Sequence, residues 1–388
     1  MTNCLIILFF ISAFFILQTY LLYPLWMLTF SKEKKNETEV YNLNDELPEV
    51  AILIAAYNEE KVIGEKIRSV LKTTYPVSKI TIYIGSDAST DNTNQIIQHL
   101  QKQFNNIKLI NFAGRTGKAN IINSLSLTAT QEIFILTDAN VIFKEDTIFN
   151  LIRHFKNQTN ALVCSNIIKV SDSDLGIAKQ EKSYIVIENK IKYAEYKRWN
   201  IVMGAEGGCY AIRKNYYSPV PKNFFMDDFY ITLNVIEKGK HVVFDKDAVC
   251  FEDVPTQAKE EFKRKIRISI GNFQNLFRYK KLLFPVWSGI AFSFWSHKVL
   301  RWLTPFFLIF CLFSSGILAI NSSLFLALFL IQVLFFLFPL INMIFPFKLS
   351  LFKFISHFYL MNLALLKGFL MFVKGVETSI WQPTQRNV

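Results

Sequence analysis

Cysteine and charge are both scarce in this 388-residue chain, and each shortage excludes a class of protein. The five cysteines are odd in number and lack the paired spacing of a disulfide framework or a zinc site. A reducing compartment is therefore expected for the main domain. Charged residues make up only 19% of the chain, whereas 51% of its residues are hydrophobic and phenylalanine occurs 38 times. The length allows one large domain or two.

The sequence also lacks a G-x-G-x-x-G motif after its first expected strand. A non-membrane dehydrogenase of the Rossmann type is therefore not expected. The net charge of +12 is compatible with nucleic acid, with an anionic membrane surface or with a phosphate-bearing substrate. Charge alone does not decide between these partners.

Long apolar runs lie at both ends of the chain. Leu5–Phe30 carries no charge and is longer than the about 20 residues that cross a bilayer core. The run has no basic segment before it and no small-residue cleavage site after it. It therefore predicts a membrane anchor, residues 1–31, and not a cleaved signal peptide. Three lysines follow within four residues, beginning at Lys32, and place this end in the cytoplasm by the positive-inside tendency.

The C-terminal region, residues 299–388, contains three further apolar stretches. Leu303–Ile320 and Leu324–Phe347 are uncharged and predict a hairpin through the bilayer. Phe354–Val373 is also long enough, but it has a polar stripe that includes Lys367. This stretch is compatible with a spanning helix whose stripe faces protein or water, and with a helix lying in the membrane interface.

Between these ends, a polar linker at 32–48 leads into a segment of alternating strand and helix patterns. The expected strands are Val50–Ala56, Ile80–Gly85, Ile107–Phe112 and Ile133–Thr137. The expected helices lie near Glu60–Leu71, Asn92–Phe104, Lys118–Leu127 and Glu145–Phe155. This alternation predicts an α/β domain at 49–257, with a mostly parallel sheet that helices cover on both faces.

Polar motifs follow three of these strands, at the edge where an open parallel sheet binds its ligands. Tyr57 and Glu59 follow the first strand, Asp87 the second and Asp138 the fourth, while Lys118 opens the third helix. A single aspartate after a strand is usually a helix cap or turn former. The whole set is more informative, because it supplies carboxylates for a base or a divalent ion, a lysine for phosphate and an aromatic ring for stacking.

The motifs YNE, SDAS, GKA and DAN, followed by GGCYAIRK, MDDF and EDVP, resemble family 2 glycosyltransferases. Within that family they are most similar to the membrane synthases of cellulose, hyaluronan and poly-N-acetylglucosamine. The resemblance extends from about Val50 to Arg278. It implies a GT-A fold, which is a Rossmann-like nucleotide-sugar-binding domain, with flanking transmembrane helices. It also implies a hexosyltransferase of cell-envelope polysaccharide biosynthesis that uses a nucleotide sugar, with UDP-glucose and UDP-N-acetylglucosamine as the leading donors.

The resemblance implies a role for each motif residue. Asp138 would bind a Mg²⁺ or Mn²⁺ ion on the diphosphate, while Asn140 replaces the family's second acidic residue and is a less certain ligand. The acceptor would approach Gly207, Gly208 and Cys209, although the two glycines are also compatible with an ordinary loop. The residues implied to bind the nucleotide sugar are Ala56, Tyr57, Glu59, Asp87, Lys118, Asp138 and Arg267.

Asp227 and Asp228 are the candidates for the catalytic base. Inverting transfer needs a carboxylate to take the proton of the acceptor hydroxyl as its oxygen attacks the anomeric carbon. Adjacent carboxylates point in different directions, so only one can do this. The resemblance to the family's ED motif selects Asp228, with Asp227 in support. The alternative is that both are surface charges that cap a helix at Phe229–Lys238.

Ala258–Leu283 predicts a basic amphipathic helix at the membrane surface, within an interfacial segment at 258–298. It takes the place of the family's Q-x-x-R-W motif, but Arg264 and Ile268 replace the glutamine and the tryptophan, and only Arg267 is kept. Loss of the ring that stacks on sugar favours transfer of one or a few sugars to a lipid-linked or glycan acceptor. The alternative is a processive polysaccharide synthase.

A non-enzymatic membrane scaffold or nucleic-acid-binding protein would also explain the basic charge. It would not explain why the motif residues occur in the family's order along an α/β pattern. The expected partners are therefore a nucleotide-sugar donor, a lipid-linked or glycan acceptor and membrane lipids, and no nucleic acid. The protein is expected to be integral to the cell or inner membrane, with its catalytic domain in the cytoplasm.

Overall fold

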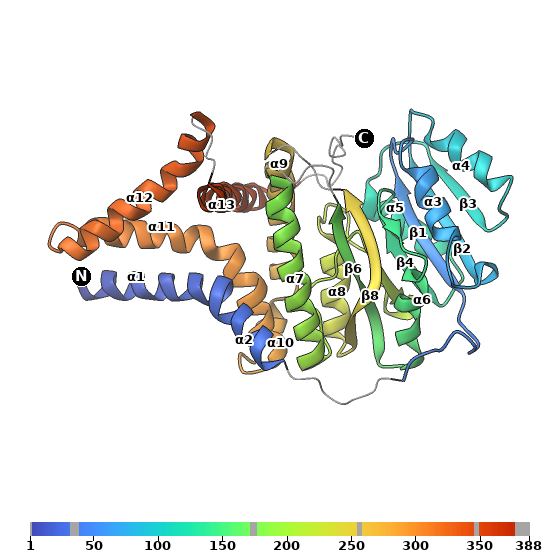
Figure 1. Cartoon of the computed structure of the whole chain (residues 1–388), viewed down its shortest axis with the longest axis horizontal. Coiled ribbons are helices and arrows are strands. Elements are labelled where there is room, and N and C mark those ends of the chain that lie inside the picture. The colour runs from blue at the N-terminus through green and yellow to red at the C-terminus, as the bar shows by residue number, and fades with distance from the viewer. Residues whose placement is uncertain (1, 32–38, 171–176, 254–257, 345–348, 377–388) are drawn as a thin grey trace. The chain divides into compact units, whose positions relative to one another are not determined.

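The chain divides into two compact units. Figure 1 shows their helices and strands, with a colour that follows the residue number. The helical unit comprises Met1–Phe30 and Gln257–Gly375, and the sheet unit comprises Ser31–Thr256 and Val376–Val388. The structure is a computed structural model that describes residues 2–31, 39–170, 177–253, 258–344 and 349–376.

The sheet unit is built on one eight-stranded sheet, with the strand order β3-β2-β1-β4-β7-β6-β8-β5. The first four strands are parallel to one another, as expected, whereas β7 runs antiparallel to both β4 and β6. The strands are β1 Val50–Ala56, β2 Ile80–Asp87, β3 Ile107–Phe112, β4 Ile133–Thr137, β5 Ile142–Phe143, β6 Asn160–Val170, β7 Cys209–Arg213 and β8 His241–Asp253. The sheet is therefore mixed, and the predicted α/β class is confirmed.

Helices cover both faces of the parallel half, because successive strand residues point to opposite faces. Ile52 and Ile54 of β1 belong to a buried cluster with residues of α3 (Ile63–Leu71), α4 (Thr93–Gln101) and α6 (Thr147–Ile152). On the other face, α5 (Lys118–Thr128) packs on β1 and β2. It approaches so closely that a Cβ atom at Gly85 would lie 2.3 Å from Ile121.

The helix boundaries differ from the expected ones by a few residues, for local reasons. Helix α3 begins at Ile63 because the carbonyl of Glu59 accepts hydrogen bonds from the backbone amides of Val62 and Ile63, which places a turn before the helix. Helix α8, Asp227–Glu237, begins two residues before the expected Phe229. Helices α7 (Ile177–Trp199) and α8 both pack against β6 and β8.

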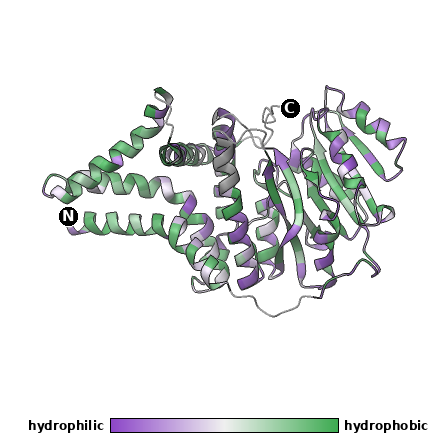
Figure 2. Cartoon of the chain, viewed as in Figure 1, coloured by the Kyte–Doolittle hydropathy of each residue, from purple (hydrophilic) through white to green (hydrophobic). Residues whose placement is uncertain are grey.

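The helical unit contains four stretches that are long and apolar enough to cross a membrane. They are Thr2–Phe30, Gly289–Leu318, Ser323–Asn342 and Leu351–Lys374. Figure 2 shows α1, α11 and α12 almost entirely in the hydrophobic colour. The elements are α1 Thr2–Leu17, the π-helical η1 Gln18–Leu22, α2 Tyr23–Phe30, α9 Ala258–Arg278, η5 Lys280–Leu283, α10 Gly289–Ser293, the π-helical η6 Phe294–Val299, α11 Leu300–Leu318, α12 Ser323–Ile344 and α13 Ser350–Lys374.

Helix α9 is the expected basic amphipathic helix, but its apolar stripe packs against protein. The ring of Phe273 lies 4.9 Å from that of Phe369 and 6.0 Å from that of Phe372, both on α13. A Cβ atom at Gly368 would meet Ser269 at 2.4 Å, so this glycine lets the two helices approach closely. The middle of the apolar stripe that predicted attachment to a membrane surface is therefore covered by α13, whereas Phe277 at its end is 61% exposed. The second candidate span begins at Gly289, inside the 258–298 segment.

Candidate active site

Lys118, the first residue of α5, lies among acidic and backbone groups from three other parts of the sheet unit. Its Nζ atom is 2.6 Å from Oδ1 of Asp138, which follows β4, and 3.8 Å from Oδ2 of Asp227 at the start of α8. It also donates a hydrogen bond to the carbonyl of Gly207, 3.3 Å away. The tertiary structure therefore brings together residues that are far apart in the sequence, since Lys118 and Gly207 are separated by 89 positions.

The electrostatic environment keeps Lys118 charged. Burial lowers the pKa of this ammonium group, but the carboxylates of Asp138, Asp227 and Asp228 oppose burial and hold the pKa above its usual value. A lysine that stays protonated at any physiological pH is suited to bind a diphosphate.

Asp228 has the properties of a general base. Only 6% of the residue is exposed, and its Oδ1 atom accepts a hydrogen bond of 2.8 Å from the backbone amide of Phe229. Burial, followed by the negative charge of Asp227, raises the pKa of Asp228 to about 7, although Lys118 acts in the opposite direction. A base with a pKa near 7 is half deprotonated at neutral pH and still binds a proton strongly. The aspartate pair is therefore not a pair of surface charges.

Gly207 and Gly208 make room for the residues around them. A Cβ atom at Gly207 would lie 2.9 Å from Oδ2 of Asp228, and one at Gly208 would lie 2.7 Å from Ile167. The carbonyl oxygen of Gly208 accepts hydrogen bonds from the Asp138 amide at 3.1 Å and the Thr137 hydroxyl at 2.8 Å. The two glycines thus serve the packing of Asp228 and Asp138, in addition to any role towards an acceptor.

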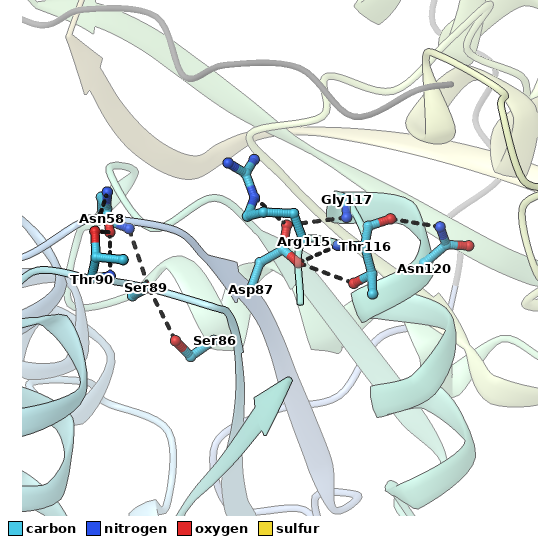
Figure 3. Close-up of polar contacts among 9 residues, drawn as sticks. All are labelled: Asn58, Ser86, Asp87, Ser89, Thr90, Arg115, Thr116, Gly117 and Asn120. Atoms are coloured by element: carbon cyan, nitrogen blue, oxygen red, sulfur yellow. Dashed lines mark hydrogen bonds and ion pairs between the residues drawn. The ribbon is translucent and has the colours of Figure 1, made fainter. Parts of the chain in front are cut away.

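Asp87 binds the loop that precedes Lys118, as Figure 3 shows. Its Oδ1 atom accepts hydrogen bonds from the Thr116 amide at 2.6 Å and from the Thr116 hydroxyl at 3.0 Å. Its Oδ2 atom accepts from the Gly117 amide and from Nε of Arg115, both at 3.1 Å. Gly117 has φ +86°, a conformation that favours glycine. Asp87 therefore fixes the position of α5 and of Lys118.

Arg115 is a residue whose role the sequence did not indicate, although it directly precedes the GKA motif. Its guanidinium lies 3.3 Å from the centroid of the Tyr57 ring, so it stacks on the aromatic side chain expected to hold the nucleoside. Asn58 joins the same region, since its amide group bonds to Thr90 and its backbone amide to Ser89 (Figure 3). The loops after β1 and β2 and the loop before α5 are thus bound together.

Five further residues were expected in the site, and the structure places them in several elements. Ala56 ends β1 and pairs with Ser86, and Cys209 begins β7 and pairs with Thr137. Asn140 is largely buried in the turn after β4. The carbonyl of Glu59 accepts hydrogen bonds from the turn that precedes α3, and Arg267 lies on α9 of the helical unit. The roles of both residues towards the donor stay predictions.

Lys66 on α3 was not expected in the site, because it is one lysine in an amphipathic helix. It is fully buried, and its Nζ atom donates to the Thr137 hydroxyl at 2.9 Å and to the Val141 carbonyl at 2.5 Å. Nζ also lies 3.4 Å from the ring centroid of Phe143. Burial lowers the pKa of Lys66 to about 8. Lys66 therefore holds both ends of the turn that carries Asp138, on the buried side of that turn.

The donors around Asp138 fit a magnesium or manganese ion shared with a ligand. Carboxylate and amide oxygens of the type offered by Asp138 and Asn140 are hard ligands, and Mg²⁺ is commonly held by one or two carboxylates together with substrate phosphates. The Asp138 side chain is 34% exposed, so it is accessible. Among the residues that the structure describes, no group of three or more His, Cys, Asp or Glu side chains is placed to hold a metal by itself.

Comparison with known proteins agrees with the expected resemblance to family 2 glycosyltransferases. Residues 51–218 match the model of glycosyl transferase family 2. The Bacillus subtilis protein named "Probable glycosyltransferase YdaM" is 24% identical over 58% of this chain, and a poly-beta-1,6-N-acetyl-D-glucosamine synthase of Staphylococcus epidermidis is 27% identical over 59%. The chain spans 56% of the length of each of these relatives.

A solved structure has a similar fold. The mannosyltransferase PcManGT from Pyrobaculum calidifontis, in complex with GDP-Man and Mn²⁺, superposes with a TM-score of 0.70 at 19% identity. The alignment covers 94% of this chain and 99% of the other. The described fold is therefore that of the GT-A glycosyltransferases. Within the chain, residues 51–218 form a domain of glycosyl transferase family 2.

Replacement of Gly207 tests the packing of the base. In Gly207→Ala, the new Cβ would meet Asp228 Oδ2 at 2.9 Å, so the carboxylate has to move. We expect kcat for sugar transfer to fall at least about tenfold, since small displacements of catalytic groups are costly. Gly64→Ala on α3, whose new Cβ has ordinary contacts of 3.4 Å, is the matched control and should retain wild-type kcat. Equal activity of both variants would contradict the proposed contact.

Replacement of Lys66 tests its hold on the Asp138 turn. Lys66→Met removes a buried charge but leaves the buried carbonyl of Val141 without this donor, so the protein should fold with an unfolding temperature that is moderately lowered. We expect kcat/KM for the donor to fall about 10- to 100-fold, as for other residues that orient a ligand-binding group. Lys72→Met is the control, because its side chain is 80% exposed and pairs with Glu145 at the surface. Unchanged donor kinetics in a folded Lys66→Met protein would show that the turn needs no support.

Proposed function

We propose that this protein is an integral membrane, inverting glycosyltransferase. It transfers a sugar from a nucleotide sugar, a UDP-sugar in the first instance, to a lipid-linked or saccharide acceptor in cell-surface glycan biosynthesis. The catalytic domain faces the cytoplasm. The observation that carries the proposal is the buried Asp228 carboxylate, with a pKa of about 7, beside the ion pair of Lys118 and Asp138.

Asp228 supports this reaction as the base. The acceptor oxygen attacks the anomeric carbon, its proton passes to the Asp228 carboxylate, and the bond between that carbon and the diphosphate oxygen breaks. Attack opposite the leaving group inverts the configuration. Asp227, 3.8 Å from Lys118, keeps negative charge next to Asp228 and thereby raises its affinity for the proton.

Lys118 and Asp138 support the departure of the diphosphate. The ammonium group of Lys118 stabilises the negative charge that develops on the leaving oxygen. Asp138, with Asn140, would hold a Mg²⁺ or Mn²⁺ ion, which supplies further positive charge at the diphosphate. Arg267 is proposed to meet the same diphosphate, a role to which a guanidinium is suited.

The nucleoside is proposed to lie beside Tyr57 and Asp87. The ring of Tyr57 offers a stacking surface, which Arg115 contacts in this structure. Asp87 is engaged with the loop at 115–117, so its contribution to nucleoside binding includes the positioning of that loop. Ala56 and Glu59 lie on either side of Tyr57 along the chain and complete the proposed donor site.

The acceptor region is proposed at Gly207, Gly208 and Cys209, next to Asp228. Arg264 and Ile268 stand in place of the family's glutamine and tryptophan, which favours addition of one or a few sugars. Processive synthesis of a polysaccharide is the second candidate. It is favoured by the similarity to poly-beta-1,6-N-acetyl-D-glucosamine synthases. The size of the radiolabelled product of the purified protein decides between them, since a long polymer made without added acceptor requires processive synthesis.

A panel of nucleotide sugars tests the function as a whole. Purified full-length protein in lipid nanodiscs is incubated with UDP-glucose, UDP-N-acetylglucosamine and GDP-mannose, and release of nucleoside diphosphate is measured. One donor should be consumed at least about tenfold faster than the others, and Asp138→Ala should abolish its consumption. Absence of turnover with every sugar of a wide panel, together with specific binding of nucleic acid, would favour the non-enzymatic alternative.

The pH profile tests the base. Because the pKa of Asp228 is raised to about 7, the base is protonated and inactive below that pH and deprotonated above it. We expect kcat/KM to rise with pH and to level off above about 7. Asp228→Asn should lower kcat at least about 100-fold and leave the affinity for UDP within about twofold. A low-pH limb that is still present in Asp228→Asn would assign the base to another group, with Asp227 the next candidate.

Chelation tests the metal. Transfer should stop in EDTA and recover when Mg²⁺ or Mn²⁺ is added, because the ion stabilises the leaving diphosphate. Asp138→Asn should raise the metal concentration needed for half-maximal activity at least about tenfold, while Asp146→Asn, an exposed aspartate paired with Lys144, should not. Full activity in chelator would show that Lys118 suffices without an ion.

A further inference from the structure

Two lysine–glutamate ion pairs lie at the segment 206–208 of the sheet unit. The first pair joins the ammonium group of Lys192 on α7 to Oε1 of Glu206. The second pair joins Lys169 on β6 to Glu252 on β8, with 2.6 Å between Nζ and Oε2. The proposed steps of sugar transfer use neither pair, although both lie beside the proposed acceptor region.

The second pair is held next to the candidate base. Lys169 and Glu252 are register partners near the ends of the neighbouring strands β6 and β8. A Cβ atom at Gly208 would lie 3.2 Å from Oε2 of Glu252, and one at Gly207 would lie 2.9 Å from Oδ2 of Asp228. The two carboxylates therefore lie against consecutive residues, whose Cα atoms are about 3.8 Å apart, and are close enough to contact the same acceptor molecule.

The same segment also contacts the proposed donor site. The carbonyl of Gly207 accepts a hydrogen bond of 3.3 Å from Lys118, and the carbonyl of Gly208 accepts one of 3.1 Å from the amide of Asp138. The backbone carbonyls thus bind the residues proposed for the diphosphate and its metal ion, whereas the Cβ positions face the base and the second ion pair. One short segment therefore connects the donor groups to the two glutamates.

The carboxylate is the more exposed member of each pair. The side chain of Glu206 is 31% exposed against 2% for Lys192, and that of Glu252 is 20% exposed against 11% for Lys169. One oxygen of each carboxylate binds its lysine. Among the residues that the structure describes, none donates a hydrogen bond to Oε2 of Glu206 or to Oε1 of Glu252. The lysines therefore support the carboxylates from the protein side, and the second oxygens can accept hydrogen bonds from a ligand.

Electrostatics keeps the first pair ionised. Burial raises the pKa of Glu206, but the ammonium groups of Lys192 and Lys169 hold this pKa below its usual value. Burial lowers the pKa of Lys192, but the carboxylates of Glu206 and Glu188 hold it above its usual value. Glu206 is therefore a carboxylate at neutral pH, and it can accept hydrogen bonds but cannot donate one.

We propose that Glu206 and Glu252 bind hydroxyl groups of a saccharide acceptor, with Lys192 and Lys169 as their positioning residues. This inference rests on the proposed function. An ionised carboxylate accepts strong hydrogen bonds from hydroxyl groups, whereas it repels a phosphate. An uncharged sugar therefore fits this subsite, and a lipid phosphate as the direct acceptor does not. The two glutamates hold the sugar so that another of its hydroxyl groups reaches Asp228.

Acceptor kinetics test this subsite. Full-length protein in lipid nanodiscs receives the donor that it consumes, with methyl β-glycosides of glucose, galactose, mannose and N-acetylglucosamine, or farnesyl phosphate, as acceptors. We expect transfer to at least one glycoside and none to farnesyl phosphate. Glu206→Gln and Glu252→Gln should each raise the acceptor KM about tenfold, because a charged hydrogen bond becomes a neutral one, and leave the affinity for UDP within about twofold. Glu132→Gln, the same change at an exposed position of the sheet unit, should alter neither value.

The lysine of the second pair provides another variant in case Glu252→Gln does not fold. The double variant Lys169→Met, Glu252→Gln removes the pair as a whole, so that no partly buried ammonium group is left without its carboxylate. It should show the same rise in acceptor KM with the same affinity for UDP. A rise in acceptor KM that is matched by an equal loss of UDP affinity would show a general structural effect and would contradict the subsite.

A binding measurement separates this inference from the proposed function. Saturation-transfer NMR detects the methyl glycosides on the UDP-bound protein and needs no turnover. Glycoside binding that weakens in Glu252→Gln, in a protein that consumes no nucleotide sugar, would contradict sugar transfer and support the sugar subsite. In a protein that does consume a donor, three results would overturn the subsite alone: unchanged acceptor KM in both glutamate variants, transfer to farnesyl phosphate, or transfer to none of the glycosides.

Discussion

The ion cluster around Lys118 is the interaction on which the candidate site depends. One ammonium group lies 2.6 Å from Asp138 and 3.8 Å from Asp227, and it also moderates the pKa of the buried Asp228. Three carboxylates in a largely buried place would repel one another without it. The cluster joins the end of β4 to the starts of α5 and α8. Its ion pairs therefore also help to fix the positions of these three elements relative to one another.

Residues next to this cluster, among them Lys66, Thr137 and Gly207, hold its members in place. Lys66 donates a hydrogen bond to Thr137, and Thr137 donates one to the carbonyl of Gly208, so a buried chain of hydrogen bonds connects α3, the end of β4 and the residue before β7. Gly207 adds the space for Asp228. A buried lysine without a carboxylate beside it is expensive, and it is tolerated here because two oxygens and the face of Phe143 surround its Nζ atom.

The two units divide the physical tasks of the protein. The sheet unit has equal numbers of basic and acidic residues, whereas the helical unit holds the net charge of +12 and the four apolar stretches. Helix α9 combines these properties, since Phe273 packs on α13 while Lys263 pairs with Glu260 of the same helix.

The sequence by itself determined the α/β pattern, the bounds of β1, β3 and β4 and the presence of the apolar spans, because local periodicity and residue type carry that information. The roles of Asp138 and Asp228 came from the resemblance to a known family and stay predictions. The antiparallel β7, the burial of Lys66 and the stacking of Arg115 on Tyr57 were decided only by the tertiary structure. Each of these depends on which distant segments become neighbours. The partners of Lys66 and Arg115 follow from that arrangement, and the residues next to them in the sequence do not predict these partners.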